Sequence, residues 1–224
     1  MAAPIQQQQQ MASKQTIKLI VLGNVIKSIS CILLLFIAKI SNSRLGLIDN
    51  SLLAIKIDVF CICGLELFTN FLNKEKVQFK LIDWAKCVIL MVVSCVFYYV
   101  VAVVFGAPFL QHTNETFHLA ILLTVTTVLP CCLALGTDIG NWVKVFVLNS
   151  YEVGAPLICY ITSIMAVLGA WMGAFPIPLD WDRPWQIWPI SCVIGNLIGY
   201  SSGLLLSSVY LLYRYRLQNK FKLT

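Results

Sequence analysis

Two acidic side chains in the last third of the chain are the residues best suited to chemistry. Asp180 and Asp182 flank Trp181 and precede Arg183. Paired carboxylates can bind a cation or act as an acid and a base. The two histidines lie in a different segment, and no serine or cysteine is placed beside a base that would activate it. We therefore predict no catalytic residues, metal site or cofactor, and expect an Asp–Arg clamp or a partner-binding surface; catalysis by Asp180 and Asp182 is the competing interpretation.

A second set of reactive groups lies inside apolar stretches. Lys27 falls in the first stretch, and Lys56 and Asp58 fall in the second. A charge in hydrocarbon is costly unless it is paired. At 1.5 Å per residue, Lys27 is about 15 Å and Asp58 about 20 Å from the same membrane face. This predicts an intramembrane ion pair between Lys27 and Asp58. An ion relay in a transporter is the alternative, but no Gly/Pro-broken pair of half-helices accompanies these residues.

The nine cysteines all fall within or at the edge of apolar stretches. The pairs Cys61-x-Cys63 and Cys131-Cys132 lack a histidine at the spacing of a tetrahedral metal site. Their placement also differs from the disulfide framework of a secreted domain. We expect them to be packing residues.

The elements that position these groups are apolar helices. The chain has 224 residues and is 59% hydrophobic and 12% charged, whereas an average soluble domain is roughly 25% charged. A hydrocarbon core about 30 Å thick needs roughly 20 mainly apolar residues per helix. The sequence therefore predicts an all-α integral membrane protein, a bundle of about six transmembrane helices joined by short loops. The expected spans are Ile17–Ile40, Leu52–Leu72, Trp84–Phe105, Phe117–Leu135, Ala155–Phe175 and Ile187–Tyr213.

The second of these stretches has two interpretations. Leu52–Leu72 carries Lys56, Asp58 and Glu66. Its length and its neighbours favour a span, and an amphipathic helix on the membrane surface is the alternative. In the second case the number of spans becomes five.

The distribution of basic residues predicts the orientation. Cytoplasmic segments carry an excess of lysine and arginine. With six spans, the two termini and the segments on their side hold eleven of the sixteen basic residues, the opposite side holds three, and two lie within spans. Both termini are therefore predicted to be cytoplasmic. The net charge of +6 follows from this topology, and we expect no nucleic-acid partner because a basic soluble face is missing.

The chain divides into three parts. Residues 1–16 contain the homopolymer Gln6–Gln10 and are predicted to be a disordered tail. Residues 17–213 form the transmembrane helical domain, and residues 214–224 form a basic cytoplasmic tail. The first apolar stretch is too long for a signal peptide and no A-x-A-like cleavage site follows it, so it is expected to be a retained anchor.

Two short motifs carry information about cellular address. Asn114-Glu115-Thr116 is an N-glycosylation sequon on the predicted lumenal side, in a loop so short that the acceptor lies close to the membrane. Lys220 and Lys222 have the spacing from the C-terminus of a dilysine retrieval signal for the endoplasmic reticulum. The plain positive-inside bias accounts for the same lysines.

Small residues recur every four positions in the last two predicted helices. Helices in lipid associate through close packing, which small side chains at this spacing allow. One interpretation is that the two ridges pack against each other, and the other is that a ridge docks against another protein; both can hold together. The ridge residues are Gly169 and Gly173 in one helix and Ser191, Gly195, Gly199, Gly203 and Ser207 in the other.

The segment between these two helices is the most unusual in the chain. Its four prolines oppose regular structure, and its tryptophans suit a membrane–water interface, where the indole body is apolar and its N–H is solvated. We expect a rigid turn against the lumenal interface. Its key residues are Pro176, Pro178, Asp180, Trp181, Asp182, Arg183, Pro184, Trp185 and Trp188.

The sequence GAWMGAFPIPLDWDRPWQIWPISC, residues 169–192, closely resembles the class F protein family of glycosylphosphatidylinositol (GPI) anchor biosynthesis. Shorter matching segments are Phe105–Pro108, Glu115–Phe117 and Thr126–Cys132. The resemblance covers roughly Cys87 to Tyr213, so nothing functional is transferred to residues 1–80.

The resemblance implies a multi-pass protein of the endoplasmic reticulum membrane that performs no chemistry itself. It implies that the chain stabilises GPI ethanolamine-phosphate transferases, which move ethanolamine phosphate from phosphatidylethanolamine to the third and second mannoses. The expected partners are these catalytic subunits and membrane lipids. We expect the last two helices and their turn to dock to the transferase. An autonomous lipid transporter or scramblase is the alternative.

Overall fold

The computed structural model describes residues 2–40, 50–72, 79–108, 111–149, 154–179 and 181–221; within α1 and α7, side chains are described only from residue 15 to 36 and up to residue 217. Regular structure in these residues is helical throughout, with no strand. The elements are α1 (Ala2–Ile40), α2 (Ser51–Leu72), α3 (Leu81–Val104), α4 (Thr113–Leu135), α5 (Ile139–Phe146), α6 (Ala155–Ala174), the 3₁₀ turn η1 (Pro184–Gln186) and α7 (Ile190–Phe221).

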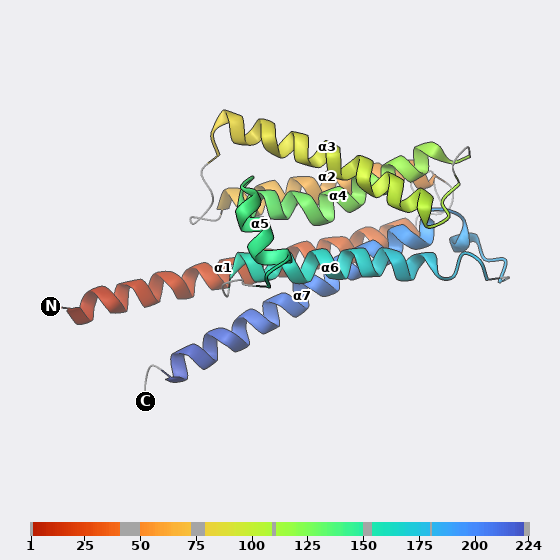
Figure 1. Cartoon of the computed structure of the whole chain (residues 1–224). Helices are drawn as coiled ribbons and strands as arrows, with labels where there is room; N and C mark the ends of the chain where they lie inside the picture. Colours follow the sequence, from red (N-terminus) through yellow and green to blue (C-terminus); the bar gives the residue numbers. More distant parts are fainter. Residues whose placement is uncertain are drawn as a thin grey trace.

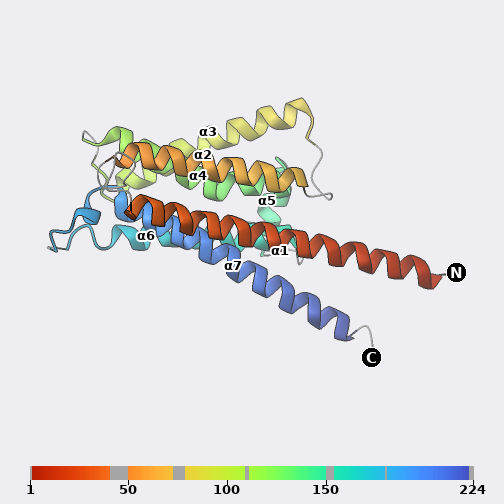
Figure 2. The same ribbon diagram turned by 180° about the vertical axis from the view of Figure 1, so that it is seen from behind.

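The long helices run side by side and alternate in direction (Figures 1 and 2). Helix α4 is the centre of the bundle and packs against α2, α3 and α6. Helix α7 packs against α6 and α1, and α1 also touches α2. We call the end at which α1 begins and α7 ends the terminal end, and the opposite end, which holds the η1 turn, the far end.

Among the described residues, five helices are long and apolar enough to cross a membrane, within α1, α3, α4, α6 and α7. Helix α2 is long enough at 22 residues, but it carries Lys56, Asp58 and Glu66. It nevertheless lies alongside α4 within the bundle, and both Asp58 and Glu66 are buried. The two acidic residues therefore face the protein, whereas Lys56 is exposed.

The first and last long helices extend beyond the spans predicted for them. Helix α1 begins at Ala2, ahead of the expected start at Ile17, and a disordered tail over residues 1–16 stays a prediction. Glutamine and alanine are good helix formers, and they extend an apolar helix that already exists. Helix α7 likewise continues to Phe221 instead of ending near Tyr213, and the assignment of residues 214–224 to a basic cytoplasmic tail stays a prediction.

The short helix α5 was not predicted. It lies across the direction of the long helices at the terminal end (Figure 1). Trp142 and Phe146 pack inward around buried Val145, whereas Ile139 and Val143 are exposed. Apolar residues at i, i+3, i+4 and i+7 from Ile139 are the sequence signal that could have revealed it.

Candidate interface and polar centre

The small-residue ridges face each other across the contact between α6 and α7. A Cβ atom added to Gly169 would lie 2.9 Å from the Cα of Gly199, and one added to Gly173 would lie 2.9 Å from the Cα of Cys192. Real Cβ atoms essentially never approach so closely, so only glycine fits at these positions. The structure thus brings the ridges together inside the chain.

The rest of the ridge on α7 belongs to the same contact. A Cβ on Gly195 would lie 3.1 Å from the Cα of Gly173, and one on Gly203 would lie 2.9 Å from the Cα of Thr162. Ser191 and Ser207 are buried at the two ends of the ridge. Because these residues are used within the chain, a partner would have to meet other surfaces of α6 and α7.

The turn between α6 and α7 is organised by Gln186. Its side-chain amide donates hydrogen bonds to the backbone oxygens of Pro176 and Leu179, both at 2.7 Å, and its side-chain oxygen accepts from the Arg183 backbone N–H at 2.8 Å. One buried side chain therefore ties together both arms of the turn and η1. Gln186 was not among the predicted site residues, because a single glutamine carries no motif.

The expected Asp–Arg clamp stays a prediction. Asp180 lies outside the described residues. Asp182 and Arg183 are exposed, and the ion pairs among described residues do not include them. Pro178 and Pro184 are also exposed, and Pro176 is half-buried. The two described charged side chains of the turn, Asp182 and Arg183, are therefore open to the surroundings.

The tryptophans of the turn divide into two roles. Trp181 is exposed and makes an edge-on contact with Trp185, with ring centroids 6.1 Å apart. Trp188 donates its indole N–H to the Thr116 hydroxyl at 2.9 Å. This bond joins the start of α7 to the first turn of α4.

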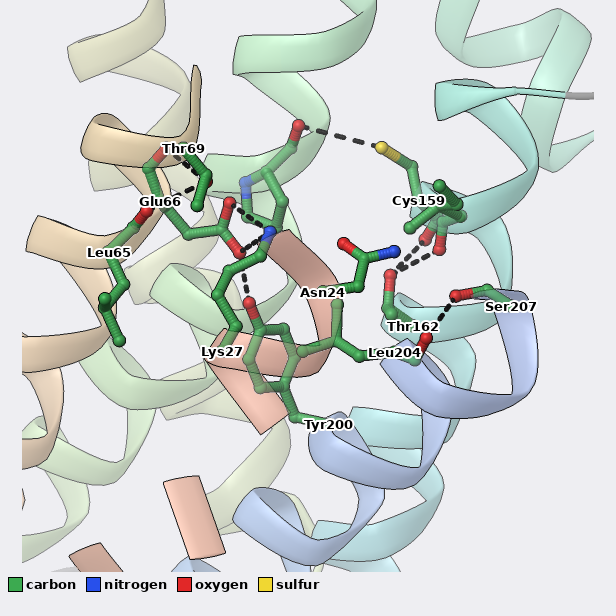
Figure 3. A network of polar contacts seen from close by, with 12 residues as sticks. Asn24, Lys27, Leu65, Glu66, Thr69, Cys159, Thr162, Tyr200, Leu204 and Ser207 are labelled. Atoms are coloured by element: carbon green, nitrogen blue, oxygen red, sulfur yellow. Dashed lines mark hydrogen bonds and ion pairs between the residues drawn. The ribbon is translucent and has the colours of Figure 1, made fainter. Parts of the chain in front are cut away.

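A buried ion pair joins α1 to α2, but its acidic partner is not the predicted one. Lys27 Nζ donates to both carboxylate oxygens of Glu66, at 3.0 and 3.1 Å (Figure 3). The Lys27 and Glu66 side chains are 10% and 5% exposed. The Tyr200 hydroxyl of α7 also donates to Glu66. The predicted Lys27–Asp58 pair is therefore wrong.

The error has a geometric cause. Asp58 and Glu66 are eight residues apart on α2, which separates them by about 12 Å along the helix axis. Depth was counted from the cytoplasmic end of each predicted span, Ile17 in the first and Leu72 in the second, as if these two ends lay at one level. Helix α1 extends past the end of α2 at the terminal end (Figure 2), which brings Lys27 level with Glu66.

Further polar contacts connect the helices in the apolar interior. Asn196 of α7 donates to the Thr126 hydroxyl of α4 at 3.3 Å and to the backbone oxygen of Ala166 in α6 at 3.2 Å. Asn24 of α1 donates to Ser208 of α7 at 3.0 Å. Hydrogen bonds of this kind fix how helices pack in lipid. They were not predicted from the sequence.

The structure describes the predicted glycosylation sequon but not the side chains of the predicted dilysine signal. Asn114 is exposed in the first turn of α4. Thr116 of the same sequon is fully buried and donates its hydroxyl to the His112 backbone oxygen. Lys222 lies outside the described residues, and Lys220 lies in α7 with its side chain not described.

The cysteines are free thiols, and six of them are buried among apolar side chains. Within the described part of the chain, no three His, Cys, Asp or Glu residues are grouped as metal ligands would be.

Comparison with known proteins identifies the family. The family described as "GPI biosynthesis protein family Pig-F" matches residues 26–208. A mouse protein named "GPI ethanolamine phosphate transferase, stabilizing subunit" is 36% identical over 177 residues, which cover 73% of this chain and 81% of the relative. The human protein of the same name is 39% identical over 139 residues, covering 62% of this chain and 64% of its own length.

A protein of Yarrowia lipolytica named "Glycosylphosphatidylinositol anchor biosynthesis protein 11" is 38% identical over 104 residues, covering 46% of this chain and 44% of the relative. No solved structure matches the chain. Since the family match extends over more than half of the sequence, from α1 to α7, the chain belongs to the Pig-F family of GPI biosynthesis proteins.

Proposed function

We propose that this protein is a non-catalytic subunit that binds and stabilises GPI ethanolamine-phosphate transferases in the membrane of the endoplasmic reticulum. The observation that carries the proposal is membership of the Pig-F family together with two relatives named as the stabilising subunit of such a transferase. In this role the chain supports transfer of ethanolamine phosphate from phosphatidylethanolamine to the third and second mannoses of the anchor precursor.

The surfaces available for the transferase are the outer face of α6 and the turn that follows it. Trp171 and Met172 are exposed on α6, as are Trp181, Asp182 and Arg183 in the turn. The glycine contact fixes α6 against α7, and Gln186 fixes the turn against the end of α6. A rigid apolar face with charged residues at one end suits a transferase helix that crosses the membrane and continues into a lumenal domain.

We place all six long helices across the membrane, with both termini in the cytoplasm. Helices α1 and α7 reach the same end of the bundle (Figure 1). Exposed Lys144, Arg214 and Arg216 lie near that end, as the positive-inside rule requires for a cytoplasmic face. Helix α2 completes the even number of crossings because its acidic side chains are buried within the bundle.

The test is to delete the chain from cells and restore it, while measuring the transferases directly. With the chain absent, transferase protein should fall and GPI intermediates that lack ethanolamine phosphate should accumulate. Affinity capture of the tagged chain in mild detergent should recover transferase in near-equal amount. Normal transferase abundance without the chain would contradict the proposal. Lipid flux by the purified chain alone in proteoliposomes would favour the transporter alternative.

A further inference from the structure

A cavity of about 230 Å³ lies beside the buried ion pair. It is larger than the roughly 150 Å³ engineered cavity that admits benzene. Its walls come from α1, α2, α4 and α6, and Figure 3 shows the polar groups next to it. A space of this size among packed helices is large enough for part of a lipid molecule.

The cavity communicates with the outside of the bundle on the side of α1 and α2. Leu22, Ile26 and Phe68 line it, and each is also exposed on the bundle surface. In a membrane this surface faces acyl chains. Its walls also include small residues, Gly23, Ala134 and Ala155, whose short side chains leave the space open.

Lys27 and Glu66 supply the polar groups of the cavity. An ammonium group has three N–H donors, and two of them bond to the Glu66 oxygens. One Glu66 oxygen accepts from Lys27 and Tyr200, whereas the other accepts from Lys27 alone among the described residues. One N–H group of Lys27 and one acceptor site on the second Glu66 oxygen therefore remain for a ligand.

The charges of Lys27 and Glu66 cancel, so the site favours an uncharged group. A hydroxyl offers one donor and an acceptor oxygen, which matches what the pair leaves. We propose that this cavity binds a neutral, hydroxyl-bearing membrane lipid, with the hydroxyl at Lys27 and Glu66 and the hydrocarbon against Leu22, Ile26 and Phe68. Diacylglycerols and sterols share this chemistry. The site is separate from the proposed transferase surface on α6, so it can exist whether or not that function is correct.

The experiment uses the full-length chain in phosphatidylcholine nanodiscs, with a photoactivatable diacylglycerol in one arm and a photoactivatable sterol in the other. In the arm with the correct lipid, mass spectrometry should locate the label in residues 19–27 and 65–72. The unlabelled lipid should compete for labelling. Its acetate ester, which has no donor, should compete about fivefold less well, the effect of one lost hydrogen bond.

Three variants test the location. Ala134→Phe and Ala155→Phe fill the cavity and should abolish most of the labelling, whereas Ala85→Phe, on the exposed face of α3 at the same end of the bundle, should leave it unchanged. The double variant Lys27→Met/Glu66→Leu should still be labelled. In this variant the unlabelled lipid and its acetate ester should compete equally well for labelling.

Labelling spread evenly over all helices, labelling unaffected by Ala134→Phe, or equal competition by the acetate would each overturn the proposal. If both cavity-filling variants aggregate, the peptide map and the acetate comparison on the unaltered chain decide the question. Loss of transferase binding with retained lipid labelling would count against the proposed function alone.

Discussion

Gly169 of α6 and Gly199 of α7 meet so closely that neither position can accept a Cβ atom. An added Cβ would lie 2.9 Å from the opposing Cα in one direction and 3.0 Å in the other. Helices gain no hydrophobic free energy by associating in lipid, so this close backbone approach is the main source of attraction between them. The contact holds α6 in place and thereby orients the turn that follows it.

We expect Gly199→Leu to separate α6 from α7 and to reduce both the thermal stability of the chain and the amount of transferase in cells. The added side chain would collide with the backbone of Met165 and Gly169. Overpacking of a buried contact costs about 1–3 kcal/mol, and here the obstacle is backbone. Fluorescence-detected size-exclusion chromatography after heating measures the first effect, and quantitative immunoblotting measures the second.

The control for this variant is Gly64→Leu. A Cβ on Gly64 meets nothing within 4 Å, and the residue is exposed on α2. Its replacement should leave both measurements unchanged. Equal thermal stability of the two variants would show that the α6–α7 contact does not determine the stability of the chain.

We expect Lys27 and Glu66 to be energetically coupled. Removing one partner leaves a buried charge and costs about 3–5 kcal/mol, whereas removing both costs less. In a double-mutant cycle by thermal unfolding in detergent, Lys27→Met/Glu66→Leu should therefore be more stable than the sum of the single changes predicts. Lys27→Met and Asp58→Asn should combine additively, because the ion pair uses Glu66. Coupling to Asp58 instead would restore the original sequence prediction.

Gln186→Leu should loosen the turn between α6 and α7. It removes three hydrogen bonds to the backbone of the turn, each contributing about 1 kcal/mol. Limited proteolysis should then cut near the turn at lower protease concentration. Arg183→Ala removes an exposed charge that the ion pairs of the described residues do not include, and it should leave the cleavage pattern unchanged. Cleavage of this variant at lower protease concentration would instead support a clamp by Arg183.

We expect Asn114 to remain without glycan. Asn114 is exposed, but Thr116, the third residue of the sequon, is buried and bonded to both His112 and Trp188, so the folded chain does not present the complete motif. Asn114→Gln should migrate like the parent chain on a gel, before and after treatment with a glycosidase. A flexible Gly/Ser insertion with its own sequon after Gly106 should be glycosylated, since this end faces the lumen in the proposed topology. A glycosidase-sensitive shift of the parent chain would contradict the expectation.

The sequence predicts helices well and their mutual positions poorly. Apolar length was enough to locate the long helices, with α4 and α6 ending within a few residues of the expected positions. The facing of Gly169 and Gly199 was one of two interpretations of the ridges, because small residues at this spacing pack equally well against the same chain or another protein.

Features that depend on offsets between helices were missed. Lys27 was paired with Asp58 because the sequence does not show how far α1 extends past α2. Gln186 and Asn196 carry no motif, and their roles arise only when distant segments come together. Helix α5 is a different case: its apolar periodicity was present in the sequence but was hidden by its short length.

The ion pair between α1 and α2 also bears on how the chain is made. Lys27 and Glu66 are separated by only 39 positions, whereas Tyr200 follows Glu66 by 134. In the proposed six-span topology, the first two helices would therefore leave the ribosome and enter the bilayer as a hairpin whose charges neutralise each other, long before α7 is translated. Tyr200 then adds its hydroxyl as the last helix arrives, so the same carboxylate serves first in insertion and later in closing the finished bundle.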